Sequence, residues 1–211
     1  FGDILEAFSP QADADSLTYH FSFPRNFIEA GRLVFVPRAV DATSPMLVNM
    51  AYIPVLAIGG ERALNLWLMI SGWAGAAFIY TICMRYMSAT WSIAAALVFL
   101  TMPAVIYSAG TGQVEIRLAL FAMVAAFSIC EAYSQRKLNF IILAGLASGF
   151  FSGGKYTGLL FIAACGLTVL YEKKWLKHSA LFSVSAVIAG SQWYIWNWIN
   201  IGDPVFPMLF P

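Results

Sequence analysis

The chain has 211 residues, of which 60% are apolar and 11% are charged, and its formal net charge is +1. Soluble domains usually contain about a quarter charged residues, so this composition indicates a polytopic membrane protein. The nearly balanced charge gives no reason to expect a nucleic-acid partner. Cys83, Cys130 and Cys165 lie in apolar runs at a spacing that fits no metal or disulfide framework, which indicates core packing.

Residues 1–63 are predicted to form an external loop with amphipathic helices on the membrane surface. Asp15 is a favoured type of helix N-cap, Pro24 is expected to interrupt the helix that follows, and Gly31 is expected to end it. The apolar run 45–60, at about 15 residues, is short of the ~20 that a span needs. It is therefore predicted as another interfacial helix.

Residues 64–211 are predicted to form an all-α transmembrane domain of about six helices. The predicted spans are 64–84, 89–107, 114–133, 138–153, 157–172 and 177–198. The pair 138–153 and 157–172 is near the lower limit of ~17 residues, so it forms either a hairpin of two crossings or a broken re-entrant element.

The basic residues of the short loops favour the hairpin. Only two crossings put all of them on one side, which the positive-inside rule assigns to the cytoplasm. They are Arg85, Arg136, Lys137, Lys173, Lys174 and Lys177. The charges of the opposite face can then converge around one cavity: Asp13, Asp15, His20, Arg25, Glu115, Arg117, Lys155 and Asp203.

Both ends of the sequence suggest that the chain is cut from a longer one. It begins with Phe1 instead of Met, without the basic region of a signal peptide, and it stops in the proline-rich stretch GDPVFPMLFP. Near the second end, the aromatic cluster at 193–198 is predicted to be an interfacial belt.

Two carboxylates are candidates for chemistry. Asp15 can take a proton from an acceptor hydroxyl or simply cap its helix, and Asp13 can exchange roles with it. Glu115 stands at the mouth of a span, where a carboxylate needs a wet cavity or a partner. An ion pair with Arg117 or snorkelling to the interface is the alternative, although i,i+2 spacing puts the two on different helix faces.

Lys155 lies in SGGKYTG between two helix ends, where it can contact a phosphate or mark a plain turn. A Walker A loop is excluded, because Tyr156 replaces the required Ser or Thr and no strand precedes it. His20 has no second histidine nearby, so a hydrogen-bonding role is favoured over metal ligation.

Four stretches resemble, in this order, the bacterial membrane glycosyltransferases of the GT-C superfamily. They are DSLTYHFSFPRNFIEAGR, TMPAVIYSAG followed by GQVEIRLALF, SGGKYTGLL, and WYIWNWINIGDPVFP. The similarity covers nearly the whole chain and is strongest to the branch related to protein O-mannosyltransferases and lipid A aminoarabinose transferases.

The resemblance implies an inverting transfer of a sugar from a polyprenyl-phosphate carrier, at the periplasmic or extracellular face of the bacterial inner membrane. Asp15 matches the general base of the family, and Glu115 matches a second acidic residue that is usually Asp in the relatives. The Gly–Lys–Tyr turn matches at Lys155 and Tyr156. The late motif departs from its relatives, which carry a basic residue before Asn197 and Asn before Pro204, where this chain has Trp196 and Asp203.

The predicted function is thus a membrane glycosyltransferase with Asp15 as general base. Glu115 is expected to orient the acceptor or help hold a cation, and Lys155 is expected to stabilise the leaving phosphate. The predicted substrate-binding residues are His20, Arg25, Lys155, Tyr156 and Asn197. The acceptor is a lipid, glycan or protein, and a divalent cation is a candidate cofactor. The alternatives are a transporter or flippase of a lipid-linked or anionic substrate, and a structural membrane subunit.

Overall fold

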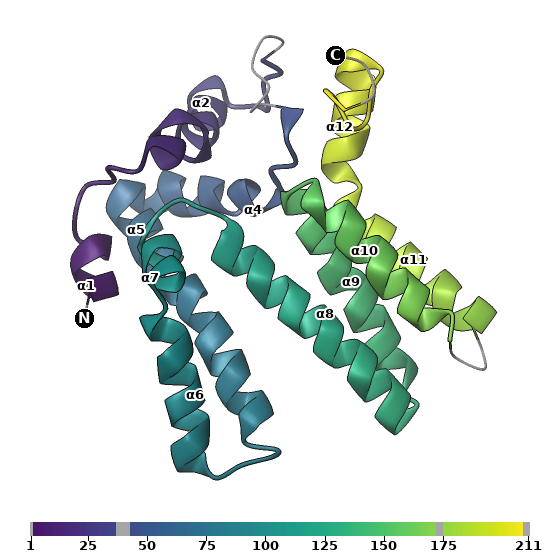
Figure 1. Cartoon of the computed structure of the whole chain (residues 1–211). Coiled ribbons are helices and arrows are strands. Elements are labelled where there is room, and N and C mark those ends of the chain that lie inside the picture. The colour runs from purple at the N-terminus through teal and green to yellow at the C-terminus, as the bar shows by residue number, and fades with distance from the viewer. Residues whose placement is uncertain (1, 37–42, 172–174, 209–211) are drawn as a thin grey trace. The chain divides into compact units, whose positions relative to one another are not determined.

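The computed structural model describes residues 2–36, 43–171 and 175–208 (Figure 1). Within these ranges the chain forms helices and turns and no strand, which confirms the all-α prediction. The chain divides into two units, residues 1–34 with 49–120 and residues 35–48 with 121–211, and each is described by itself.

The N-terminal segment of the first unit, residues 2–34, contains three short helical elements. They are α1 (Gly2–Ala7), the π-helical turn η1 (Ser16–His20) and α2 (Ser22–Ala30). Gly31 ends α2 in the left-handed conformation, with φ 62°, as predicted. Pro24 does not interrupt a helix, because it lies in the first turn of α2, where a backbone N–H has no intrahelical partner.

The run predicted as an interfacial helix is continuous with the first predicted span. After the short helix α4 (Leu47–Met50), α5 extends over Tyr52–Cys83 and leaves helical geometry only at Gly60, with φ 65° and ψ −163°. Only glycine adopts such a conformation without strain. The two predicted elements are therefore one helix with a bend.

The second predicted span is broken. Its residues form α6 (Ala89–Thr101) and α7 (Pro103–Gly110), which meet at an angle of 71°. Pro103 causes the break, because proline disfavours helical geometry in the residue before it, and Met102 is extended. The third predicted span is present as α8 (Glu115–Gln135), inside which the boundary between the two units falls.

The second unit holds α9 (Leu138–Gly154), α10 (Thr157–Val169), α11 (Trp175–Gly190) and α12 (Gln192–Ile201) (Figure 1). The predicted single span 177–198 is thus two helices that break at Ser191. Lys173 and Lys174, on which part of the predicted topology depends, lie outside the described residues.

Helices α9 and α11 pack at backbone contact. A Cβ atom built on Gly145 would lie 2.4 Å from the carbonyl oxygen of Phe182, and one on Gly149 would lie 2.3 Å from that of Ala186. One on Gly190 would lie 2.4 Å from the Gly149 oxygen. Small residues spaced four apart allow this close approach of helices in membranes.

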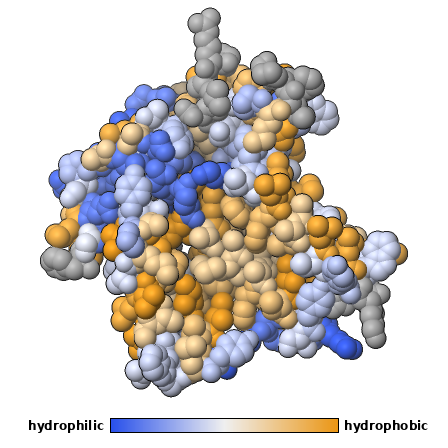
Figure 2. Space-filling view, viewed as in Figure 1, coloured by the Kyte–Doolittle hydropathy of each residue, from blue (hydrophilic) through white to orange (hydrophobic). Residues whose placement is uncertain are grey.

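Among the described residues, α5 and α8 are long and apolar enough to cross a membrane, and the bent pair α6–α7 is a third candidate. Helices α9 and α10 are apolar but shorter. The six-span count and the division at residue 63 remain predictions. In the first unit, Figure 2 shows hydrophilic residues gathered over the N-terminal segment and hydrophobic residues over α6, where Trp91, Leu97 and Val98 are exposed.

Candidate functional site

The N-terminal segment is fastened to α5 and α7 by amide side chains. Gln11 Nε2 donates hydrogen bonds to Asn65 Oδ1 at 3.1 Å and to the carbonyl oxygen of Gly110 at 2.8 Å. Asn65 Nδ2 donates to the Ser9 carbonyl oxygen at 3.2 Å. These bonds fix the chain directly before the two candidate carboxylates.

The carboxylate of Asp13 accepts four hydrogen bonds. The Ser16 amide, the Ser16 hydroxyl and Gln113 Nε2 donate to Oδ2 at 2.8, 2.7 and 3.2 Å, and the Tyr107 hydroxyl donates to Oδ1. Three of these donors bond to Oδ2 and one bonds to Oδ1, so most of the roughly four acceptor sites of the Asp13 carboxylate are taken by the protein itself. Partial burial favours the neutral acid, but the hydrogen bonds from Tyr107, Ser16 and Gln113 outweigh it and hold the pKa of Asp13 below its ordinary value.

Asp15 is the more available of the two carboxylates. The Ser16 amide donates its hydrogen bond to Asp13, and the Asp15 side chain makes no cap bond. The alternative prediction, that Asp15 caps the helix with its side chain, is therefore wrong. Asp15 is exposed, and among the described residues Gln113 Nε2, at 3.3 Å, is the donor to its carboxylate. Asp15 therefore keeps lone pairs directed to solvent.

The loop before α8 is bound to η1 and α5 at consecutive residues. The Gly112 amide donates to Ser16 Oγ at 2.8 Å, and the Tyr52 hydroxyl donates to the Gly112 carbonyl oxygen at 3.0 Å. Arg117 Nη1 donates to the carbonyl oxygen of Gln113 at 2.6 Å. The Gln113 side chain thus projects from a backbone held on both sides.

Arg117 is buried, with 4% of its surface exposed, and is bound by oxygen atoms of the first unit. It donates to Ser71 Oγ at 2.9 Å and to the carbonyl oxygens of Leu68 at 2.5 Å and Ser108 at 3.2 Å. A buried cation in a membrane protein needs such partners. Glu115 is exposed, so the two side chains occupy different faces of α8, as their spacing predicts.

His20 is buried behind the two aspartates, with 4% of its surface exposed. Asn49 Nδ2 lies 2.7 Å from His20 Nδ1, and a hydrogen bond donated by this amide requires the tautomer of His20 that carries its proton on Nε2. Burial lowers the pKa of His20 to about 4, against the opposing fields of Glu115, Asp15 and Asp13. His20 is therefore neutral at pH 7.

Acidification from pH 7 to pH 5 is expected to destabilise the protein by about 2 kcal/mol through His20. Its pKa is about 4 when folded and 6.5 as a free side chain, so the unfolded chain takes up the proton first. The contribution is complete above pH 6.5 and is lost as the pH falls toward 4. Thermal unfolding at both pH values should show a smaller loss of Tm for His20→Gln than for the wild type, with His178→Gln as control. Equal losses in all three would contradict this.

A polar cavity of about 630 Å³ adjoins Asp13 in the first unit. It is lined by Glu6, Ser9, Pro10, Gln11, Ala12, Asp13, Ala14, Tyr107 and Thr111. Partial burial raises the pKa of Glu6, and the carboxylates of Asp3 and Asp13 raise it further. This lining of carboxylate, hydroxyl and amide groups, without a basic side chain, suits a hydroxyl-bearing ligand and repels a phosphate.

Tyr156 of the Gly–Lys–Tyr turn and Asn197 of the late motif both bind backbone oxygens in the second unit. The Tyr156 hydroxyl donates to the carbonyl oxygens of Phe206 at 2.7 Å and Thr43 at 3.0 Å. Asn197, which is fully buried, donates through Nδ2 to the Thr43 oxygen at 2.6 Å and to the Tyr156 hydroxyl at 3.2 Å. Lys155 is exposed at the junction of α9 and α10. The half-buried Tyr156 and the buried Asn197 thus anchor the chain next to Lys155.

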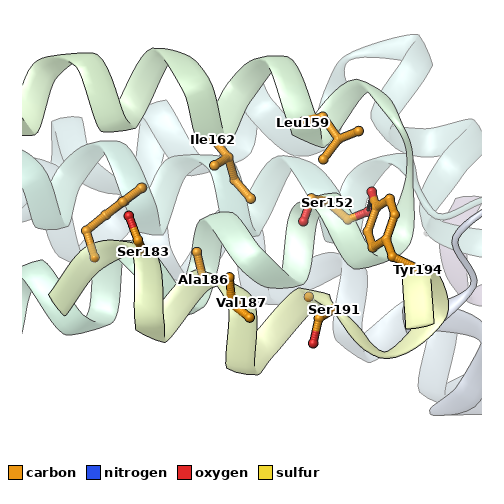
Figure 3. Close-up of a pocket in the computed structure, with 10 residues that line it drawn as sticks. Ser152, Leu159, Ile162, Ser183, Ala186, Val187, Ser191 and Tyr194 are labelled. Carbon is orange, nitrogen blue, oxygen red and sulfur yellow. Dashed lines mark hydrogen bonds between the residues drawn. The ribbon is translucent and has the colours of Figure 1, made fainter. Parts of the chain in front are cut away.

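An apolar pocket of about 340 Å³ lies on α9, α10, α11 and the start of α12 in the second unit (Figure 3). Its walls include Leu159, Ile162 and Val187, and the Tyr194 hydroxyl at one end donates to the carbonyl oxygen of Ser152 at 2.7 Å. Such walls suit a hydrocarbon chain.

The structure brings together some of the predicted site residues. Asp13, Asp15, His20 and Glu115 belong to the first unit, where each carboxylate acts electrostatically on His20. Arg25, also in this unit, forms an exposed ion pair with Glu61. Lys155, Tyr156 and Asn197 belong to the second unit. No group of three or more His, Cys, Asp or Glu side chains in the described part of the chain could hold a metal ion, and the divalent cation stays a prediction.

Sequence reasoning missed Gln113, which contacts both candidate carboxylates. A signal was present, because Gln113 stands two residues before Glu115 in the stretch GQVEIR. It also missed Tyr107 and Ser16 as partners of Asp13, which only the folded chain brings to that side chain.

A family model described as dolichyl-phosphate-mannose-protein mannosyltransferase matches residues 45–196, which is more than half of the chain. The matched range contains Glu115, Lys155 and Tyr156, begins after Asp15 and ends one residue before Asn197. No curated protein and no solved structure gave a significant match.

Proposed function

The chain belongs to the dolichyl-phosphate-mannose-protein mannosyltransferase family and is a multi-pass membrane glycosyltransferase, and from this premise we propose that it transfers a sugar from a polyprenyl-phosphate carrier to an acceptor hydroxyl. The observation that carries the proposal is the pair Asp13 and Asp15. Asp13 accepts four hydrogen bonds, whereas Asp15 is exposed and accepts one among the described residues, from the Gln113 amide. A general base needs the second kind of environment, because it must reach the proton it removes.

In the proposed reaction, Asp15 takes the proton of the acceptor hydroxyl as that oxygen attacks the anomeric carbon. The bond between this carbon and the phosphate oxygen breaks, the phosphate leaves with the electron pair, and the configuration inverts. Phosphate is a good leaving group, so the reaction needs positive charge near it but no general acid. Lys155 is the proposed source of that charge, with Arg25, whose surface ion pair with Glu61 is worth about 0–1 kcal/mol and can be exchanged.

The two cavities support separate places for the two substrates. The acidic cavity beside Asp13 suits the acceptor, which Glu115 is proposed to orient. The apolar pocket beside Tyr194 suits the hydrocarbon chain of the carrier. His20, Tyr156 and Asn197 are proposed to hold these substrate-binding surfaces in place. From the charge of the loops we place the reaction at the non-cytoplasmic face. The resemblance to bacterial enzymes implies that this is the periplasmic or extracellular face of a bacterial inner membrane.

The proposal is tested by following radiolabel in membranes that contain the protein. With polyprenyl-phosphate-mannose as donor, chosen because the family description names mannose, label is expected to pass to a lipid, glycan or protein fraction. A nucleotide sugar is expected to give no transfer. Binding and movement of the lipid-linked donor across the membrane without any transfer would instead establish the flippase.

A further inference from the structure

We propose that Gln113 is a positioning residue, which orients Asp15 for proton transfer by bridging it to Asp13 with one amide group. The inference rests on the proposed role of Asp15 as the base. It assigns a function to a residue outside the predicted catalytic and substrate-binding set.

The bridge has a simple geometry. Gln113 Nε2 lies 3.2 Å from Asp13 Oδ2 and 3.3 Å from Asp15 Oδ2. A primary amide nitrogen carries two hydrogens, so it can donate one to each carboxylate at the same time. Asp13 is already fixed by Ser16 and Tyr107. The amide therefore ties the exposed carboxylate of Asp15 to the carboxylate of Asp13, which other residues hold in place.

The backbone that carries the amide is fixed as well. Arg117 binds the Gln113 carbonyl oxygen at 2.6 Å, while Ser16 and Tyr52 bind the two polar groups of Gly112 at 2.8 and 3.0 Å. Asp15 has no such support of its own, because its side chain is exposed and makes no cap bond. A catalytic carboxylate must be held within a narrow range of angles by rigid neighbours. Gln113, whose own backbone is fixed, is such a neighbour for Asp15.

The amide also lies between two carboxylates, to both of which it donates. A donor to a carboxylate favours its ionised form, and it separates two like charges that would otherwise disfavour each other. The other titratable groups that act around Asp15 are Asp13 and His20 on its own segment, Tyr107 on α7 and Glu115 on α8. Asp13 and Glu115 would need to gain a proton before they could donate to Asp15, and Tyr107 would have to leave Asp13.

The test compares kcat, KM and the pH profile of kcat/KM for wild type, Gln113→Met and Gln113→Glu, with the polyprenyl-phosphate-mannose donor. Methionine keeps the length of the side chain and removes the donor, so we expect kcat to fall about 10-fold and the acid limb to move up by about 0.5–1 pH unit, with donor KM within about twofold. Glutamate adds a like charge, and its acid limb should move further.

Gln135→Met is the matched control. Gln135 also donates its amide to a carboxylate, that of Glu131, but at the last residue of α8, where no part of the site lies. Its pH profile should equal that of the wild type. A Gln113→Met enzyme with reduced kcat and an unmoved acid limb would overturn the inference and leave the base standing. Full transfer by Asp15→Asn in the same assay would instead reject Asp15 as the base.

Discussion

Replacing Asp15 with Asn is expected to lower sugar transfer by about 10²–10⁴-fold, the usual contribution of a general base. The substitution keeps the shape of the side chain and removes its capacity to take a proton. Asp15 is exposed, and its carboxylate receives one hydrogen bond among the described residues, from Gln113. The amount of folded protein and its Tm should therefore remain close to those of the wild type, and transfer of radiolabel in membranes measures the loss.

Asp13→Asn is the matched comparison, because the two aspartates are two residues apart and share the same amide donor. It should lower stability by about 1 kcal/mol or more, since one of the bound oxygens becomes an NH₂ group that repels its former donors. Transfer should remain measurable. The opposite pattern, with transfer lost in Asp13→Asn and kept in Asp15→Asn, would assign the base to Asp13.

Much of the helical architecture follows from apolar run length. The span predicted at 114–133 is α8, Glu115–Gln135, because no proline or glycine interrupts that run. The predicted helix boundaries are wrong where a single residue changes the direction of the backbone. Pro103 divides the span predicted at 89–107, and Gly60 joins two predicted elements by a bend. Run length detects apolarity, and it does not show whether a single proline or glycine bends, breaks or merely begins a helix.

The site was predictable in residue type but not in its connections. Asp15 is a reasonable base from its surroundings in sequence. The choice between Asp15 and Asp13, however, depends on which side chains donate hydrogen bonds to each carboxylate. Tyr107 and Gln113, which decide that choice, are more than 90 residues away along the chain. Likewise, the bonds of Tyr156 and Asn197 to the backbone oxygens of Thr43 and Phe206 connect residues far apart in the sequence, while the substrate-binding role of both side chains stays a prediction.

Gly149→Ala is expected to destabilise the protein by about 3 kcal/mol, although alanine is the better helix former. The added Cβ atom would lie 2.3 Å from the backbone oxygen of Ala186 and 2.9 Å from the Ala189 side chain. Neither backbone can yield without moving α9 away from α11, since a Cβ atom built on Gly190 of α11 would likewise lie only 2.4 Å from the Gly149 oxygen. Thermal unfolding in detergent should show a fall in Tm of roughly 6–12 °C.

Gly166→Ala distinguishes this packing effect from any general effect of the substitution. Gly166 lies inside α10, and a Cβ atom there would meet only the Phe182 ring, at an ordinary distance of 3.8 Å. Alanine should then stabilise the helix by about 0.5–1 kcal/mol. Similar Tm values for the two variants would show that α9 and α11 are not in backbone contact. α9 ends at Gly154, directly before Lys155, and lines the apolar pocket with α11. Gly149→Ala should therefore also weaken donor binding, and Gly166→Ala should leave it intact.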